Sequence, residues 1–98
     1  MRKFRNYKED LFKDLKDPEY AAAYLNAALE DEDPKVFLIA LKDIADANGG
    51  VATLAKKSGL NRENLYRTLS QRGNPRLQSL MAILQACKLD ISIRPTAA

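Results

Sequence analysis

The segment from residue 51 to residue 76 carries side chains that could bind a polyanion. It contains a single acid, Glu63, against six cations, which are Lys56, Lys57, Arg62, Arg67, Arg72 and Arg76. Guanidinium and ammonium groups pair with phosphate oxygens, and arginine can also donate two parallel hydrogen bonds to guanine. The asparagine and glutamine side chains of the same segment have the amide geometry that pairs with adenine. The segment therefore has the residue types needed to hold a nucleic-acid backbone and to read base edges.

The charge of the chain is divided unevenly between its two halves. Residues 1–48 contain eight Lys/Arg and eleven Asp/Glu, a balance of −3. Residues 49–98 contain eight Lys/Arg and two Asp/Glu, a balance of +6. This asymmetry indicates that one half faces a polyanion and the other does not, or that the two halves face different partners. The alternative is a soluble domain whose charges are divided by chance.

Local signals predict the helices that must position this segment. Asn6 with Glu9 resembles a capping box, and Asp17-Pro18 and Asp33-Pro34 each place a capping acid before a proline that suits the first helical position. Asn48-Gly49-Gly50 ends the third of these helices, because glycine adopts the left-handed conformation of a helix C-terminus. Apolar residues at helical spacing define the inner faces. They are Leu11, Phe12 and Leu15; Ala21, Tyr24, Leu25, Ala28 and Leu29; and Phe37, Ala40, Leu41, Ile44 and Ala45, with Val36, Leu38 and Ile39 widening the last face.

The cationic segment itself has the pattern of two short helices joined by a tight turn. Val51, Leu54 and Ala55 form the inner side of the first helix, and Gly59 provides the positive φ that the turn needs. Asn61 can cap the second helix, which Leu65 and Leu69 hold to the body. This arrangement predicts a helix-turn-helix. The alternative is an ordinary corner between two helices whose outer face is merely solvated.

The last part of the chain predicts one more helix and a strand. Gly73-Asn74-Pro75 breaks the preceding helix, and a final helix carries Leu77, Leu80, Met81, Leu84 and Cys87 on one face. Leu89, Ile91 and Ile93 then alternate with polar residues, which is the periodicity of a strand. A single strand needs a partner for its backbone, and a two-fold mate could supply it. An extended tail that packs its apolar side chains on the helices is the alternative.

These signals together predict an all-α fold, a compact bundle of about five to six helices with a helix-turn-helix and a short C-terminal strand. We expect residues 1–98 to form a single helix-turn-helix DNA-binding domain. Within it, residues 1–16 form an N-terminal extension or short helix, residues 17–88 the helical core and residues 89–94 the strand.

The helix-turn-helix geometry assigns roles to individual side chains, because the second helix enters the major groove while the first crosses the backbone. The expected base contacts are Asn61, Arg62, Asn64 and Arg67. The expected phosphate contacts are Thr53, Lys56, Lys57, Tyr66, Ser70, Gln71, Arg72, Asn74 and Arg76.

The chain resembles Cro/Xre-type helix-turn-helix proteins and, more closely, the HigA-like addiction module antidote proteins, which are antitoxins of bacterial toxin–antitoxin pairs. The resemblance extends from about Tyr7 to Ile93. It rests on LKDPEYAAAYLNAALEDEDP (15–34), LAKKSGLNRENLYRTLSQRGNP (54–75) and LQSLMAILQACKLDISI (77–93). Two positions depart from the Cro-type pattern: Val51 stands where glutamine is usual, and Thr68 where an apolar residue is common.

The resemblance implies a dimeric repressor that binds double-stranded operator DNA, represses its own operon and neutralises a RelE/ParE-like toxin. A cytoplasmic location is the default expectation, because the sequence shows neither a signal-peptide pattern nor a bilayer-spanning run. The acidic half, including Asp31 and Glu32, is the expected dock for a basic toxin. Two other functions remain open: a stand-alone phage-type repressor, and a helical protein-interaction module without DNA binding. A small, basic reading frame beside this gene would favour the antitoxin over the phage-type repressor. A DNA affinity that falls steeply with salt would favour either repressor over the interaction module.

Enzymatic, metal-binding and membrane functions receive no support from the sequence. The chain has no histidine, no glycine-rich phosphate loop and a single cysteine, Cys87, on the apolar face of a predicted helix. We therefore expect no catalytic activity, no cofactor and no metal. No apolar run approaches the roughly 20 residues that span a bilayer, so no membrane association is expected.

Overall fold

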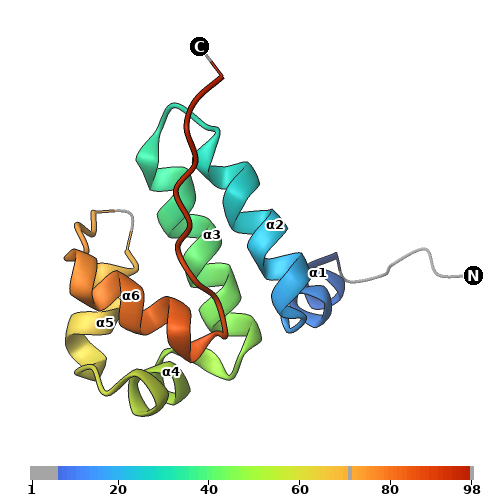
Figure 1. Ribbon diagram of the computed structural model, residues 1–98. Helices are drawn as coiled ribbons and strands as arrows, with labels where there is room; N and C mark the ends of the chain where they lie inside the picture. Colours follow the sequence, from blue (N-terminus) through green and yellow to red (C-terminus); the bar gives the residue numbers. More distant parts are fainter. Residues whose placement is uncertain (1–6, 71, 98) are drawn as a thin grey trace, which may run out of the picture.

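The computed structural model describes residues 7–70 and 72–97. Within these ranges the chain folds into six α-helices, and none of the described residues is in a β-strand. In chain order the helices are α1 (Tyr7–Leu15), α2 (Pro18–Leu29), α3 (Pro34–Ala47), α4 (Gly50–Ser58), α5 (Arg62–Thr68) and α6 (Leu77–Ala86) (Figure 1). None of these helices is long and apolar enough to cross a lipid bilayer. The predicted cap at Asn6 lies outside the described residues.

The two Asp-Pro pairs begin α2 and α3 as the sequence predicts. Asp17 has an extended backbone, and its Oδ1 accepts a hydrogen bond from the backbone N–H of Glu19 at 3.1 Å. Asp33 caps α3 in the same way and accepts from the backbone N–H of Lys35 at 2.9 Å. The proline after each cap occupies the first helical position, where a backbone N–H would have no partner in the helix. Both helix starts are therefore determined by adjacent residues.

Helix α3 is the centre of the packing, because it lies against α1, α2 and α4 (Figure 1). A single cluster of buried apolar side chains takes members from every helix, including Leu15, Leu25, Ile44, Leu54, Leu65 and Ile83. No polar or charged side chain among the described residues is buried. The charge asymmetry of the sequence thus becomes an asymmetry of the surface: α1–α3 with their links carry eleven of the thirteen acids, whereas α4–α6 with their links carry six cations and one acid.

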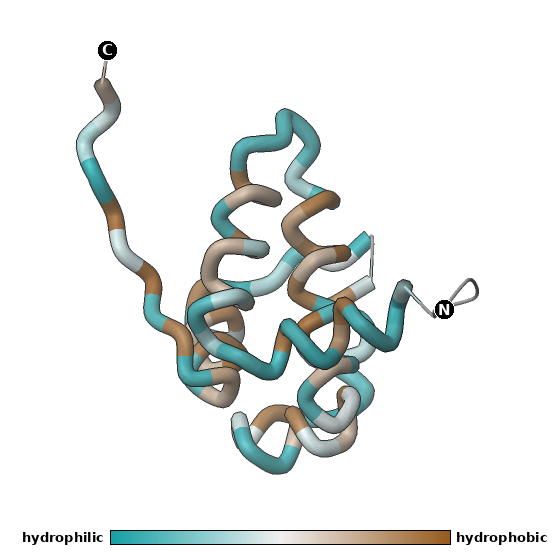
Figure 2. Tube along the Cα trace, turned by 90° about the vertical axis from the view of Figure 1, so that its right-hand side faces the viewer, coloured by the Kyte–Doolittle hydropathy of each residue, from teal (hydrophilic) through white to brown (hydrophobic). Residues whose placement is uncertain are grey.

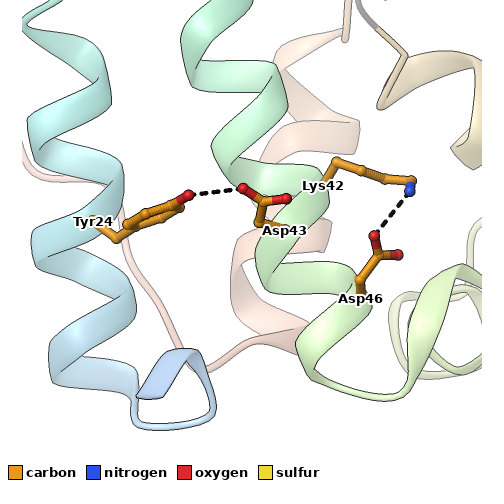
Figure 3. Close-up of polar contacts among 4 residues, drawn as sticks. All are labelled: Tyr24, Lys42, Asp43 and Asp46. Carbon is orange, nitrogen blue, oxygen red and sulfur yellow. Dashed lines mark hydrogen bonds and ion pairs between the residues drawn. The ribbon is translucent and has the colours of Figure 1, made fainter. Parts of the chain in front are cut away.

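A partly buried hydrogen bond joins α2 to α3. The hydroxyl of Tyr24 donates to Oδ2 of Asp43 at 2.7 Å, and within α3 the neighbouring Lys42 pairs with Asp46, one turn later, at 3.0 Å (Figure 3). Burial, followed by the hydrogen bond to Asp43, raises the pKa of Tyr24 to about 12. The Lys42–Asp46 pair is partly exposed and contributes only a few tenths of a kcal/mol. The Tyr24–Asp43 hydrogen bond therefore joins the two helices, whereas the Lys42–Asp46 pair lies within α3.

Replacing Tyr24 with phenylalanine is expected to lower the free energy of unfolding by about 0.5–1.5 kcal/mol at neutral pH. Because the pKa is higher in the folded state, the stabilisation is complete below the unfolded value, about 10, and is lost as the pH rises through about 12. Urea unfolding at several alkaline pH values should show a steeper loss for the wild type than for Tyr24→Phe. Tyr20→Phe, an exposed site on the same helix, should stay within about 0.5 kcal/mol of the wild type.

The predicted C-terminal strand at residues 89–94 is wrong. Helix α6 ends in a reversal at Lys88, whose φ is +64°, with hydrogen bonds from the backbone N–H of Lys88 to Gln85 and of Leu89 to Leu84. Leu89 is buried by this reversal, and the chain then continues as an extended tail. Alternating residues can only favour a strand, and among the described residues no other extended segment supplies the hydrogen-bonding edge that a strand requires.

Some residues assigned to the inner helix faces are exposed. Leu29 at the end of α2 is 62% exposed, and Ile39 on α3 is 43% exposed. On α6 the buried face runs through Ile83, Leu84 and Cys87, whereas Leu77 is 65% and Met81 is 45% exposed. Helical spacing places apolar residues on one face, but it does not say how much of that face the rest of the chain covers.

Candidate nucleic-acid interface

Helices α4 and α5 are joined by a three-residue connection, Gly59 to Asn61. Gly59 has a φ of +76°, as the sequence predicts, and its N–H donates to the carbonyl of Ala55 at 3.0 Å. The hydroxyl of Ser58 accepts from the N–H of Leu60 at 3.3 Å, and the Leu60 side chain packs against the core. The chain therefore reverses tightly at the glycine, and the turn is held from both sides.

Buried leucines fix α5 to the body. Leu65 is 1% and Leu69 is 3% exposed, and both join the core cluster together with Leu54 and Ala55 of α4. All the other residues from Asn61 to Arg67 are exposed. Helix α5 thus lies on the surface with only its apolar side covered, so its polar side chains are accessible to a ligand.

Arg62 and Tyr66 form a stacked pair on the outer side of α5. The guanidinium carbon of Arg62 lies 5.9 Å from the centroid of the Tyr66 ring, within the range of a cation–π contact. A shallow depression beside them is lined by Asn61, Arg62, Glu63 and Tyr66. The stacking restricts the Arg62 side chain while leaving its guanidinium edge accessible, and this edge is what a base or a phosphate would contact.

Two of the predicted DNA contacts already have partners inside the protein. The Oδ1 atom of Asn61 accepts from the backbone N–H of Asn64 at 3.1 Å and so caps α5. The Ser70 hydroxyl donates to the carbonyl of Arg67 at 2.8 Å. A bidentate contact from Asn61 to adenine would compete with the cap for the same oxygen, and loss of such a cap costs about 1 kcal/mol. Asn61 is therefore best suited to positioning α5, and Arg62, Asn64 and Arg67 are the better placed base-reading candidates.

The predicted phosphate contacts lie on both sides of α5. Lys56 and Lys57 are exposed in the last turn of α4, and Thr53 is half-buried near its start. After α5, Arg72, Asn74 and Arg76 are exposed in the segment that leads to α6. Gln71 lies outside the described residues.

The segment between α5 and α6 depends on Gly73 in a way that the sequence did not reveal. A Cβ atom at this position would lie 2.0 Å from the backbone oxygen of Thr68, so only glycine fits. The N–H of Gly73 also donates to the carbonyl of Ser70 at 2.8 Å. The sequence identified Gly73 as a helix breaker, but the requirement is for space. The close backbone approach keeps Arg72 and Asn74 next to α5.

The cations of this surface form no ion pair with other residues that the structure describes. No ion pair within the described part of the chain involves any of the six cations between residues 51 and 76. From residue 49 onward the chain has eight Lys/Arg against two Asp/Glu. A cluster of unpaired cations on exposed helices creates a positive potential that attracts polyanions and raises association rates.

Cys87 does not belong to this surface. It is buried, and burial raises the pKa of its thiol, an effect that nearby Lys57 only partly offsets. A neutral, buried thiol is a poor nucleophile and a poor metal ligand, so Cys87 acts as a small apolar core residue. Among the described residues no group of three or more Cys, Asp or Glu side chains is placed to hold a metal ion.

The fold and this surface define a small all-helical protein that presents a short cationic helix on one side. The chain belongs to the family described as "Probable addiction module antidote protein", which matches residues 6–95. An uncharacterized protein of Haemophilus influenzae (strain ATCC 51907 / DSM 11121 / KW20 / Rd) is 33% identical over 85 residues, 87% of each chain. No solved structure matches the chain. Membership of this family supports an antitoxin role and implies a cognate toxin.

Proposed function

We propose that this protein is the antitoxin of a toxin–antitoxin pair and that it represses its own operon by binding operator DNA through α4 and α5. The observation that carries the DNA-binding part is the exposed polar side of α5, bordered by unpaired cations and anchored by Leu65 and Leu69. In this proposal α4, the turn at Gly59 and α5 are a helix-turn-helix of the Cro/Xre type within a single cytoplasmic domain.

The proposed contacts follow from where each side chain lies. Arg62, Asn64 and Arg67 read bases in the major groove, and Asn61 contributes its free amide N–H groups while its oxygen keeps the cap. Phosphates are held from the flanks of α5 by exposed cations and hydroxyl or amide groups. These residues are Thr53, Lys56, Lys57, Tyr66, Ser70, Gln71, Arg72, Asn74 and Arg76.

We also propose that the protein binds DNA as a homodimer. The exposed apolar side chains of Leu77 and Met81 are one helical turn apart on α6, and a second copy could cover them. Two-fold symmetry would place the two α5 helices about 34 Å apart, one turn of the duplex. The dimer would then bind two half-sites of a palindromic operator.

The toxin partner proposed here is a basic protein of the RelE/ParE-like fold, as the resemblance to HigA-like antitoxins implies. Residues 17–46, which span α2 and α3, contain eight Asp/Glu and two Lys/Arg, a balance of −6. Opposite charge steers association and selects the partner. Within this acidic part, the four acids of residues 30–33, which join α2 to α3, are the proposed dock for a basic toxin, while the cationic surface remains available for DNA.

A salt titration with duplex DNA tests the DNA-binding function. With the DNA upstream of the gene as probe, we expect log Kd to rise with log salt with a slope of about 0.9 per phosphate contact. Six phosphate contacts in all would weaken binding by roughly a thousandfold between about 50 and 200 mM salt. An absence of binding to this DNA at about 50 mM salt would favour a protein-interaction module instead.

A further inference from the structure

An open groove of about 870 Å³ lies between the α2–α3 hairpin and parts of the segment from residue 72 to residue 92. Its lining is largely apolar and includes Leu25, Leu29, Phe37, Leu38, Leu84 and Ile91. Leu29 is 62% exposed on one wall, and Ile91 is 45% exposed on the other. Large aliphatic side chains that face solvent from both walls of one groove indicate a surface that a partner covers.

The C-terminal tail forms one wall of this groove. It runs beside the helices in Figure 1 and stands apart from them in Figure 2, where hydrophobic and hydrophilic residues alternate along it. No backbone hydrogen bond joins residues 90–94 to other described parts of the chain. The backbone groups of this wall are therefore available to a bound partner in addition to the apolar side chains.

The rim of the groove is acidic where α2 meets α3. Residues 30–35 contain four acids and one lysine, and Asp31 and Glu32 line the groove directly. Asp90 adds a further carboxylate from the tail, whereas Lys35 and Arg72 are the lining cations. Asp31 and Asp33 accept backbone hydrogen bonds at 2.9 Å, but no ion pair within the described residues neutralises these carboxylates. An apolar floor with an acidic rim is complementary to a cationic amphipathic segment.

We propose that this groove binds a cationic amphipathic segment of the cognate toxin, whose apolar side chains pack against Leu29 and Ile91 and whose lysines or arginines pair with the acidic rim. The proposal rests on the antitoxin function proposed above and names the surface that performs it. The apolar anchors contribute most of the affinity, and the rim charges contribute mainly to the association rate and to partner choice.

Charge argues against a second copy of this chain as the occupant. A two-fold contact presents the same patch from both subunits. The four acids of residues 30–33 would then lie in the same interface as their four copies, and bringing these like charges together disfavours such a contact. The groove is therefore better matched to a basic protein than to itself.

Two substitutions and two matched controls test this proposal. The probe is the toxin encoded beside this gene, purified from the co-expressed pair and titrated by calorimetry. Leu29→Lys removes an anchor and adds a like charge, and Glu32→Lys reverses a rim charge. We expect each to weaken toxin binding by about tenfold or more. Ile39→Lys and Glu19→Lys make the same changes at exposed sites of α3 and α2 outside the groove, and they should stay within about twofold of the wild type.

The measurements distinguish the groove proposal from the antitoxin and DNA-binding functions proposed above. Melting temperature and DNA affinity should change no more in the groove variants than in their controls. Wild-type toxin affinity in Leu29→Lys would overturn the groove proposal and leave the antitoxin function standing. Conversion of a dimer to a monomer by Leu29→Lys in sedimentation would also overturn it, because a second copy would then be the occupant. A wild-type protein that binds operator DNA but not the toxin would overturn both the groove and the antitoxin function.

Discussion

Replacing Arg67 with alanine is expected to weaken operator binding by about 1–3 kcal/mol, roughly 5- to 150-fold, and to relax specificity at one base position. Arg67 is exposed on α5 and forms no ion pair within the described residues, so its guanidinium is free to donate two hydrogen bonds to a guanine. Fluorescence anisotropy with the operator and a set of single-base variants would measure the loss. At one base position, Arg67→Ala should bind all four bases with similar affinity. At the other positions, it should keep the base preferences of the wild type.

The matched control is Lys56→Ala on α4. Lys56 is also exposed and cationic, but it lies on the helix proposed to cross the backbone. Its loss should weaken binding to all sequences alike and reduce the magnitude of the log–log salt slope by about one. If both substitutions gave equal losses on every sequence, Arg67 would be a phosphate contact, and base reading would fall to other residues of α5.

The parts of the fold that the sequence predicted well are those that adjacent residues determine. Asp17 and Asp33 cap their helices because an acid and a proline stand side by side, and Asn61 caps α5 through the N–H of Asn64 three residues later. Gly59 has the positive φ expected of it, because few other residues adopt that conformation without strain. Such signals lie within a few residues of the feature they produce, so they can be recognised from sequence alone.

The parts that the sequence did not predict depend on where the fold places other parts of the chain. A strand at residues 89–94 needs an edge to pair with, and alternation cannot say whether one exists. The exposure of Leu77 and Met81 depends on how much of α6 the other helices cover, which their spacing does not reveal. The need for glycine at position 73 comes from the backbone of Thr68, five residues away but brought close by the turn.

The candidate site also has features that the sequence predicted and features that it did not. Periodicity correctly separated the inward Leu65 and Leu69 from the exposed Tyr66 and Arg67 between them, so the outer side of α5 was predicted. Its internal hydrogen bonds were not: Asn61 and Ser70 were assigned to DNA, although each already has a partner in the protein. A list of exposed polar residues thus overstates the number that are free to bind, because caps and turns use the same residue types.

Replacing Ile44 with alanine is expected to lower the free energy of unfolding by about 2–5 kcal/mol. Ile44 is fully buried on α3, the helix that packs against α1, α2 and α4, so the cavity would lie where the acidic and the cationic halves meet. Neighbouring helices cannot close the cavity without moving, because each is held by further buried residues. Urea unfolding followed by circular dichroism should show a lower midpoint with an unchanged slope.

Ile39→Ala on the same helix is the matched control, since it removes the same atoms from a side chain that is 43% exposed. Ile39→Ala should lower the free energy of unfolding by about 1 kcal/mol or less, which is less than a core substitution costs. Because all six helices share one core, Ile44→Ala should lower the unfolding midpoint of both halves together. Toxin binding and DNA binding, measured across the urea series, would monitor the two halves. If the DNA-binding half unfolded independently of α1–α3, the two activities would be lost at different denaturant concentrations, and the view that a single core positions both surfaces would be wrong.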